Sequence, residues 1–249
     1  MPDPYRVRGD YRARPEPAYD DDPDDGVVWQ PDVYRTAADV AEAVGARRIV
    51  DIGCGRGAKL AAQHPRFEIL GLDFGTNIAH CRETYEFGTW VEHDLEGPGV
   101  LPVEPELLRD SIVVCADVIE HLVSPELLLE KLRAALEHAA AVLVSTPERE
   151  LWAGIRDSGP PRNRCHVREW SMREFGWLLR SHGMPYHSIG LTRSNDRTEE
   201  LHTMLAVIGP TADAVDGMLP AIIDASPPSP RRHPMLIRLA RTVRIALRG

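Results

Sequence analysis

Three acidic residues, Asp51, Asp73 and Asp94, each lie at or near the end of a short apolar run. Such runs are typical of buried parallel strands, whose carboxyl ends meet at the edge of a sheet where ligands bind. One carboxylate there can simply cap the turn that follows. Three at successive strand ends indicate a shared ligand, and Asp73 is placed to offer two oxygens to the two hydroxyls of a ribose.

A glycine-rich turn follows the first run, in the order Asp51-x-Gly53-x-Gly55-x-Gly57. Glycines let the backbone approach a ligand closely because no Cβ intervenes, and the helix predicted from Ala58 offers unpaired N–H groups. Read from Gly53, the spacing passes for a dinucleotide-binding turn. With Asp51 included, it resembles the first motif of the class I S-adenosylmethionine (SAM)-dependent methyltransferases. A carboxylate there suits the sulfonium and amino groups of SAM but repels a pyrophosphate.

The resemblance implies a cofactor-binding set along this edge of the sheet. In the methyltransferase family, an acid in the position of Asp94 accepts a hydrogen bond from the adenine amino group. The residues that we expect to contact SAM are Asp51, Gly53, Gly55, Gly57, Asp73, Phe74, Asp94, Leu95 and Asp117.

A second group of reactive side chains lies in the stretch Asp117-Val-Ile-Glu120-His121-Leu122. In the methyltransferase fold, the end of the fourth strand lies beside the transferred methyl group. A hydroxyl acceptor needs a base, which contributes about two to four powers of ten in rate. The stretch is similar to the E-V-I-E-H-L segment of small-molecule O-methyltransferases such as those of ubiquinone biosynthesis. We therefore expect Glu120, His121 and the more distant His166 to be catalytic.

The same side chains also resemble a metal site. The small-RNA 2′-O-methyltransferases place E-x-x-E-H here and a later histidine before a helix start, and these residues ligate a divalent ion that grips a ribose diol. This chain has Asp117, Glu120, His121 and His166, with a shorter acid in the first position. Oxygen and imidazole ligands suit Mg²⁺ or Mn²⁺. This set is the alternative to our expectation that no metal is bound.

The elements that carry these residues follow the pattern of an α/β protein. Apolar runs alternate with helical periodicity up to residue 147, which predicts a doubly wound, Rossmann-like, mostly parallel sheet. Two last strands look like the C-terminal antiparallel hairpin that completes the seven-stranded methyltransferase sheet. The predicted strands are 49–52, 67–73, 89–95, 111–118, 141–147, 186–192 and 201–208.

The connection 148–168 lacks periodicity, and a connection of that length is usually functional or disordered. We expect it to cover the acceptor. After it, Ser171 and Glu174 have the spacing of a capping box, a helix start that fixes the geometry of His166. Parts of this region are similar to methyltransferases of bacterial glycan and natural-product glycoside pathways. The resemblance favours a hydroxyl or amine of a small-molecule or glycosidic acceptor.

Composition and charge set the remaining expectations. The 249-residue chain has four cysteines without C-x-x-C pairing, and prolines and charges occupy the place of a signal peptide, so we expect a cytoplasmic protein. The net charge is −9, and because residues 231–249 hold six arginines and no acid (+6), the rest of the chain carries −15. So acidic a body argues against nucleic acid as a partner, because nucleic-acid binding relies on phosphate neutralisation. Two other functions stay open: an NAD(P)-dependent oxidoreductase and a non-catalytic SAM-binding module.

Four segments are predicted along the chain. Residues 1–28 have the composition of a disordered acidic and aromatic tail, with a strap over the active site as the alternative. Residues 29–209 form the methyltransferase domain, 210–230 a proline-rich linker and 231–249 a cationic amphipathic helix. The arginines of 235–248 fit either peripheral contact with anionic lipid or docking on the acidic body.

Overall fold

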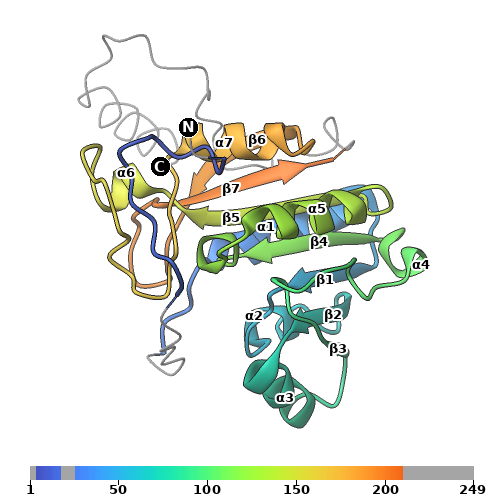
Figure 1. Ribbon diagram of the computed structural model, residues 1–249. Coiled ribbons are helices and arrows are strands. Elements are labelled where there is room, and N and C mark those ends of the chain that lie inside the picture. Colours follow the sequence, from blue (N-terminus) through green and yellow to red (C-terminus); the bar gives the residue numbers. More distant parts are fainter. Residues whose placement is uncertain (1–3, 18–25, 210–249) are drawn as a thin grey trace, which may run out of the picture.

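The computed structural model describes residues 4–17 and 26–209, which form a seven-stranded sheet with helices on both faces (Figure 1). The order in the sheet is β3-β2-β1-β4-β5-β7-β6, and β7 runs antiparallel to both of its neighbours. The predicted Rossmann-like sheet with a C-terminal antiparallel hairpin is therefore confirmed. The strands are β1 (Arg48–Ile52), β2 (Glu68–Asp73), β3 (Thr89–Glu92), β4 (Ser111–Ala116), β5 (Ala141–Pro147), β6 (Tyr186–Thr192) and β7 (Thr203–Ile208).

Two hydrophobic cores lie on opposite faces of the sheet. Helices α1 (Pro31–Val44), α2 (Ala58–Ala61) and α3 (Gly75–Thr84) contribute to one core, and α5 (Pro125–Leu136) and α7 (Met172–Ser181) contribute to the other. Three shorter elements lie in the connections: α4 (Pro105–Leu108), α6 (Arg149–Trp152) and the 3₁₀ turn η1 (Ile119–His121).

The alternation of side chains along β1 decides which way its acid points. Val50 and Ile52 belong to the core under α5 and α7, whereas Ile49 belongs to the core under α1. Successive strand residues face opposite sides of a sheet. Asp51 therefore faces α1, where Tyr34 meets it.

Two strands end earlier than the apolar runs predict. β3 ends at Glu92, so Asp94 lies in the following loop, and β4 ends at Ala116. Asp117 has φ 57°, a left-handed conformation that cannot continue a strand. The turn at Asp117 directs the chain into η1 and so places Glu120 and His121 at the carboxyl end of the sheet.

Residues 4–17, whose composition indicated a tail, lie against α7 and the loop after α6 (Figure 1). Val7 and Tyr11 are buried in the core shared with α5 and α7, so the structure differs from a disordered tail over these residues. The composition of the segment predicted disorder because its charged and proline residues outweigh these two apolar side chains, and composition does not show that the two are buried.

Two predicted segments, the linker at 210–230 and the cationic helix at 231–249, lie outside the described residues. Within residues 4–17 and 26–209, no helix combines the length and the apolar character that crossing a membrane requires.

Candidate active site

The glycine turn between β1 and α2 is held against β2. The amides of Gly53 and Cys54 both donate to the carbonyl oxygen of Leu72, at 2.8 and 3.0 Å. Gly53 has φ 80°, and a Cβ there would lie 2.4 Å from Cγ2 of Val118. The backbone conformation and the turn after β4 therefore both require glycine at this position.

Asp51 is the acid of the predicted motif, and its side chain is fully buried. Tyr34 donates its hydroxyl hydrogen to Oδ2 at 2.6 Å, whereas Oδ1 is buried and has no hydrogen-bond partner among the described residues. Burial raises the pKa of Asp51 to about 6, although Tyr34 and Lys59 act in the opposite direction. A nearby cation favours the ionised form of a carboxyl group, so this orphaned oxygen fits the cationic groups of SAM.

Asp73 holds the glycine turn, and Asp94 holds its own loop. Oδ2 of Asp73 accepts a hydrogen bond from the amide of Gly55 at 2.8 Å, and Oδ1 accepts from the amide of Phe74 at 2.8 Å. Oδ1 of the exposed Asp94 accepts from the amide of Glu96 at 2.9 Å. Both acids lie at the predicted edge, and their contacts with ribose and adenine stay predictions.

Other members of the predicted cofactor set differ in their exposure. Gly55 and Gly57 have positive φ values of 57° and 77°. Phe74 is 50% exposed at the end of β2, whereas Leu95 is 6% exposed and packs in the core under α5. The ring of Phe74 is thus available to a ligand, and the side chain of Leu95 is already covered.

Two carboxyl groups, of Asp117 and Glu120, lie together after β4. Glu120 is fully buried, and its Oε2 accepts a hydrogen bond from the hydroxyl of Thr146 at 2.9 Å. Oε1 of Glu120 and Oδ1 of Asp117 are buried without a donor among the described residues. Burial and the adjacent Asp117 raise the pKa of Glu120 well above its ordinary value. A cation bound beside Glu120 would favour the ionised form of its carboxyl group.

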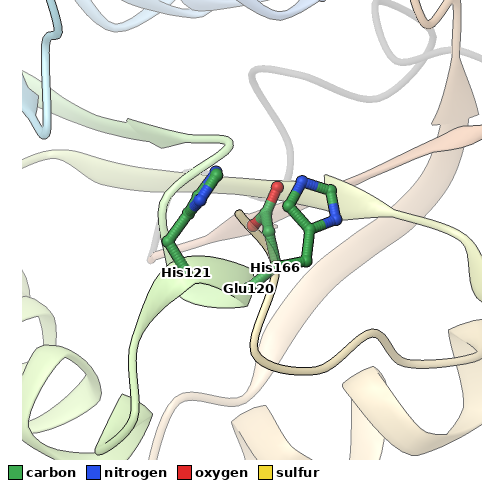
Figure 2. Close-up of side chains that lie close together, drawn as sticks. All are labelled: Glu120, His121 and His166. Carbon is green, nitrogen blue, oxygen red and sulfur yellow. The ribbon is translucent and has the colours of Figure 1, made fainter. Parts of the chain in front are cut away.

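His121 and His166 approach each other beside Glu120 (Figure 2), with ring centroids 4.8 Å apart and planes at 88°. Nδ1 of His121 lies 2.9 Å from the carbonyl oxygen of Cys165, which can only accept, so this nitrogen carries the hydrogen. Nδ1 of His166 lies 2.6 Å from Oε1 of Glu169 and donates to it in the same way. In the neutral state, both imidazoles therefore have Nε2 as the basic nitrogen.

Asn163 engages the basic nitrogen of His166. Its Oδ1 accepts from the amide of Cys165 at 2.9 Å, which orients the side-chain amide so that Nδ2 lies 3.0 Å from Nε2 of His166 and donates to it. An acceptor hydroxyl or a metal ion must replace this neutral donor in order to reach Nε2.

The structure brings together three of the four residues of the alternative metal set. One ligand atom from each of Glu120, His121 and His166 lies within 4.8 Å of the others (Figure 2). Asp117 adjoins Glu120 but does not belong to this group. The hydrogen bonds to Cys165 and Glu169 orient the two rings as the outer contacts of metal-bound histidines do. The trio therefore has the chemistry to hold a divalent ion once Asn163 has moved.

Sequence reasoning missed four residues that hold these groups in place: Tyr34, Thr146, Asn163 and Glu169. The even spacing Asn163-x-x-His166-x-x-Glu169 was a visible signal for two of them. Tyr34 and Thr146 lie 17 and 26 residues from their carboxylate partners, so no local pattern could identify them.

The reversed β7 distinguishes this sheet from a plain dinucleotide-binding domain, and the buried acid before the glycine turn agrees with that distinction. Together these two features define the protein as a class I SAM-dependent methyltransferase. A sequence profile of the methyltransferase-domain family matches residues 20–189, and the chain belongs to this family. SAM is thus the cofactor, and the oxidoreductase alternative is removed.

Individual proteins agree with this assignment. A relative from Mycolicibacterium smegmatis (strain ATCC 700084 / mc(2)155), named a probable SAM-dependent methyltransferase, is 29% identical over 186 residues, which are 69% of this chain and 64% of the relative. The chain thus spans less than two thirds of that relative's length.

Solved structures share the fold at low sequence identity. The methyltransferase domain of bacterial CtHen1-C superposes with a TM-score of 0.51 at 20% identity, over 72% of this chain and 98% of that one. Magnesium protoporphyrin IX methyltransferase from Synechocystis PCC 6803, solved with bound S-adenosylhomocysteine (SAH), also has a TM-score of 0.51, at 14% identity over 72% and 83% of the two chains. At these identities the similarity shows the fold alone.

Cofactor affinity should depend on the ionisation of Asp51. SAH carries a positively charged amino group, and we expect its affinity to fall by up to about tenfold per pH unit below about pH 6, because a protonated carboxyl must first lose its proton. Above that pH the carboxylate is already ionised and the affinity should level off. Isothermal titration from about pH 5 to 8 measures the profile. Asp51→Asn should bind SAH more weakly with a flat profile, and an unchanged slope in this variant would contradict the role of Asp51.

Proposed function

We propose that this chain transfers the methyl group of SAM to a hydroxyl or amine of a small-molecule or glycosidic acceptor bound under the loop 148–168. The observation that supports this most is the position of the histidine pair relative to the glycine turn. Val118 packs against Gly53 of that turn and lies three residues before His121, whose ring meets that of His166. Basic nitrogens therefore lie where the fourth strand ends beside the cofactor turn.

When bound, SAM supplies a methyl carbon that an acceptor oxygen or nitrogen attacks as the carbon–sulfur bond breaks, and the acceptor's proton must then leave. Nε2 of His121 or His166 takes that proton. The carbonyl of Cys165 and the carboxylate of Glu169 hold the opposite nitrogens, so each ring keeps its basic nitrogen toward the site. Most of the acceleration comes from positioning, and the base adds about two to four powers of ten.

The connection 148–168, which begins with α6, offers apolar surface to an acceptor. Trp152 and Ile155 are 43% and 69% exposed, and the ring of Trp152 lies 6.0 Å from that of His202. Exposed apolar side chains near a catalytic edge are common in ligand pockets. An aromatic face of this kind suits the apolar face of a sugar ring or another planar acceptor.

Direct methyl transfer tests the proposal. The full chain is incubated with SAM labelled in its methyl group and with panels of glycosides, phenols and amines, and product is followed by mass. Transfer to a hydroxyl or amine supports the proposal. SAH binding without transfer to any member of broad panels favours the non-catalytic SAM-binding module instead.

A second candidate is methyl transfer assisted by a divalent ion, which the trio Glu120, His121 and His166 favours. A cation there would stabilise the ionised form of Glu120 and compensate the two buried carboxylate oxygens that lack donors. It would also orient an acceptor that carries two neighbouring hydroxyls. In this candidate the histidines are ligands, and their Nε2 atoms no longer act as bases.

Titration with Mn²⁺ separates the two candidates. If the trio is a metal centre, we expect the full chain to bind one Mn²⁺, and His121→Ala and Glu120→Gln to weaken it by more than about tenfold, since even outer-shell changes cost about 10–100-fold. His182→Ala, at the far end of α7, is the control and should bind as the wild type does. The measurement is the paramagnetic resonance signal of free Mn²⁺. If all four proteins leave the ion free, the histidines keep their assignment as bases.

A further inference from the structure

The segment 4–17 lies outside the region 20–189 that the family profile matches, yet it is hydrogen-bonded to the loop that carries His166. The amide of Arg12 donates to the carbonyl of Ser158, and the amide of Arg14 donates to the carbonyl of Val167, both at 2.8 Å. The guanidinium of Arg14 also donates to the carbonyl of Pro161. Two parts of the chain 146 to 153 residues apart are thus joined along their backbones.

Buried side chains fix the segment as well. Tyr11 is 8% exposed, and the fully buried guanidinium of Arg149 lies 4.6 Å from the centre of its ring. Arg149 pairs with Glu174 at the start of α7 at 2.8 Å, and the amide of Arg8 donates to the same carboxylate at 2.9 Å. A charged group without exposed surface is costly to rearrange. The segment therefore has a defined place against the loop.

Tyr11 is linked to the histidine pair through one residue. The amide of Glu169 donates to the hydroxyl oxygen of Tyr11 at 3.1 Å, and the carboxylate of Glu169 accepts from Nδ1 of His166 at 2.6 Å. Glu169 is 1% exposed, and its second oxygen is buried without a hydrogen-bond partner among the described residues. The carbonyl oxygen of Glu169 also accepts a hydrogen bond from Arg149, at 3.0 Å, so Tyr11 and the Arg149 beneath its ring together hold the backbone that carries this carboxylate.

We propose that residues 4–17 form a strap that closes the loop 155–169, and that Tyr11 is a positioning residue for His166. The catalytic importance of holding His166 in place rests on the proposed function, whereas the contacts between the strap and the loop do not depend on it. The strap holds Glu169 through Tyr11, Glu169 keeps the hydrogen of His166 on Nδ1, and Nε2 then faces the site. Tyr11 itself does not touch the reacting atoms.

Two readouts on the full chain test the strap without an acceptor. Long-range proton–nitrogen correlation spectra report which nitrogen of His166 carries the hydrogen. The rate at which N-ethylmaleimide alkylates Cys165, followed by peptide mass, reports opening of the loop, because Cys165 is 8% exposed within it. The buried Cys54, Cys81 and Cys115 lie elsewhere in the fold and serve as internal references.

Tyr11→Phe removes the hydroxyl and keeps the ring over Arg149. We expect mixed tautomers at His166 and about fivefold faster alkylation of Cys165, the effect of losing one hydrogen bond. Arg14→Ala should also open the loop by about the same factor. Tyr186→Phe, which loses a hydroxyl contact with Arg180 at the opposite end of the sheet, should match the wild type in both readouts. SAH affinity should stay within about twofold in every variant, since the glycine turn is untouched.

Wild-type tautomers and alkylation rates in Tyr11→Phe would overturn the proposal. Loss of SAH binding together with faster alkylation of all four cysteines would also overturn it, because the residue would then support the whole fold. Failure of methyl transfer is a separate result. If no acceptor is methylated but Tyr11→Phe alters His166, the strap stands and the proposed function falls.

Discussion

Replacing Gly53 by alanine should weaken SAH binding by at least about a hundredfold, or roughly 2.7 kcal/mol. The left-handed backbone at this position costs a residue with a Cβ about 1–2 kcal/mol, and Gly53 has φ 80°. The new Cβ would also lie 2.4 Å from Cγ2 of Val118, and such overpacking typically costs about 1–3 kcal/mol. The turn must shift to relieve both, which moves its amides away from the cofactor. Isothermal titration with SAH measures the loss.

Two variants separate the causes of that loss. Gly53→Ala combined with Val118→Ala removes the steric contact and should recover about tenfold of the affinity, leaving the backbone strain. Gly45→Ala is the matched control, because Gly45 has φ 70° but no atom within 4 Å of its Cβ position and ends α1 far from the turn. It should lower stability by about 1 kcal/mol with SAH affinity unchanged. If the double variant is no better than the single one, Val118 is not the obstacle.

His166→Ala should lower the rate of methyl transfer by about two to four powers of ten, the contribution of a positioned base. SAH affinity should change little, because Asp73, which holds the glycine turn, and the buried Asp51 lie on β2 and β1, whereas His166 lies in the loop before α7. The measurements are kcat with an acceptor from the methyl-transfer panels and the Kd of SAH by titration. Loss of kcat with an intact Kd locates His166 at the chemical step.

Two further variants test whether the loss of kcat is specific to the basic nitrogen of His166. His182→Ala removes a histidine at the C-terminal end of α7 and should leave kcat within about twofold. His166→Gln keeps a polar side chain without a basic nitrogen and should be as slow as the alanine variant if proton removal is the lost function. Full activity in His166→Gln would leave His166 as a hydrogen-bond partner of the acceptor and not its base.

The fold could be predicted from the sequence because its signals are local. Continuous apolar runs such as 112–116 are what a strand covered on both faces requires, and β4 is buried along its whole length. The capping box of Ser171 and Glu174 is present with both of its hydrogen bonds. The glycine at position 53 by itself indicates a turn after the strand, since other residues avoid a positive φ.

The end of β4 shows where local signals stop. The apolar run continues to Val118, but the strand ends at Ala116 because Asp117 adopts a left-handed conformation. A single aspartate can take that conformation at modest cost, and the sequence does not show that it does. The histidine arrangement depends on this turn, since η1 starts from it.

The sequence by itself determined the order of strands and helices, the glycine turn with its acid, and the residue types available for chemistry at the carboxyl edge of the sheet. The tertiary structure alone decided which of these side chains meet. His121 and His166, Asp51 and Tyr34, and Tyr11 and Glu169 come from separate elements. Periodicity and turn chemistry act over a few residues, whereas such pairs arise when distant segments pack against one sheet, and only packing assigns each buried polar group its partner.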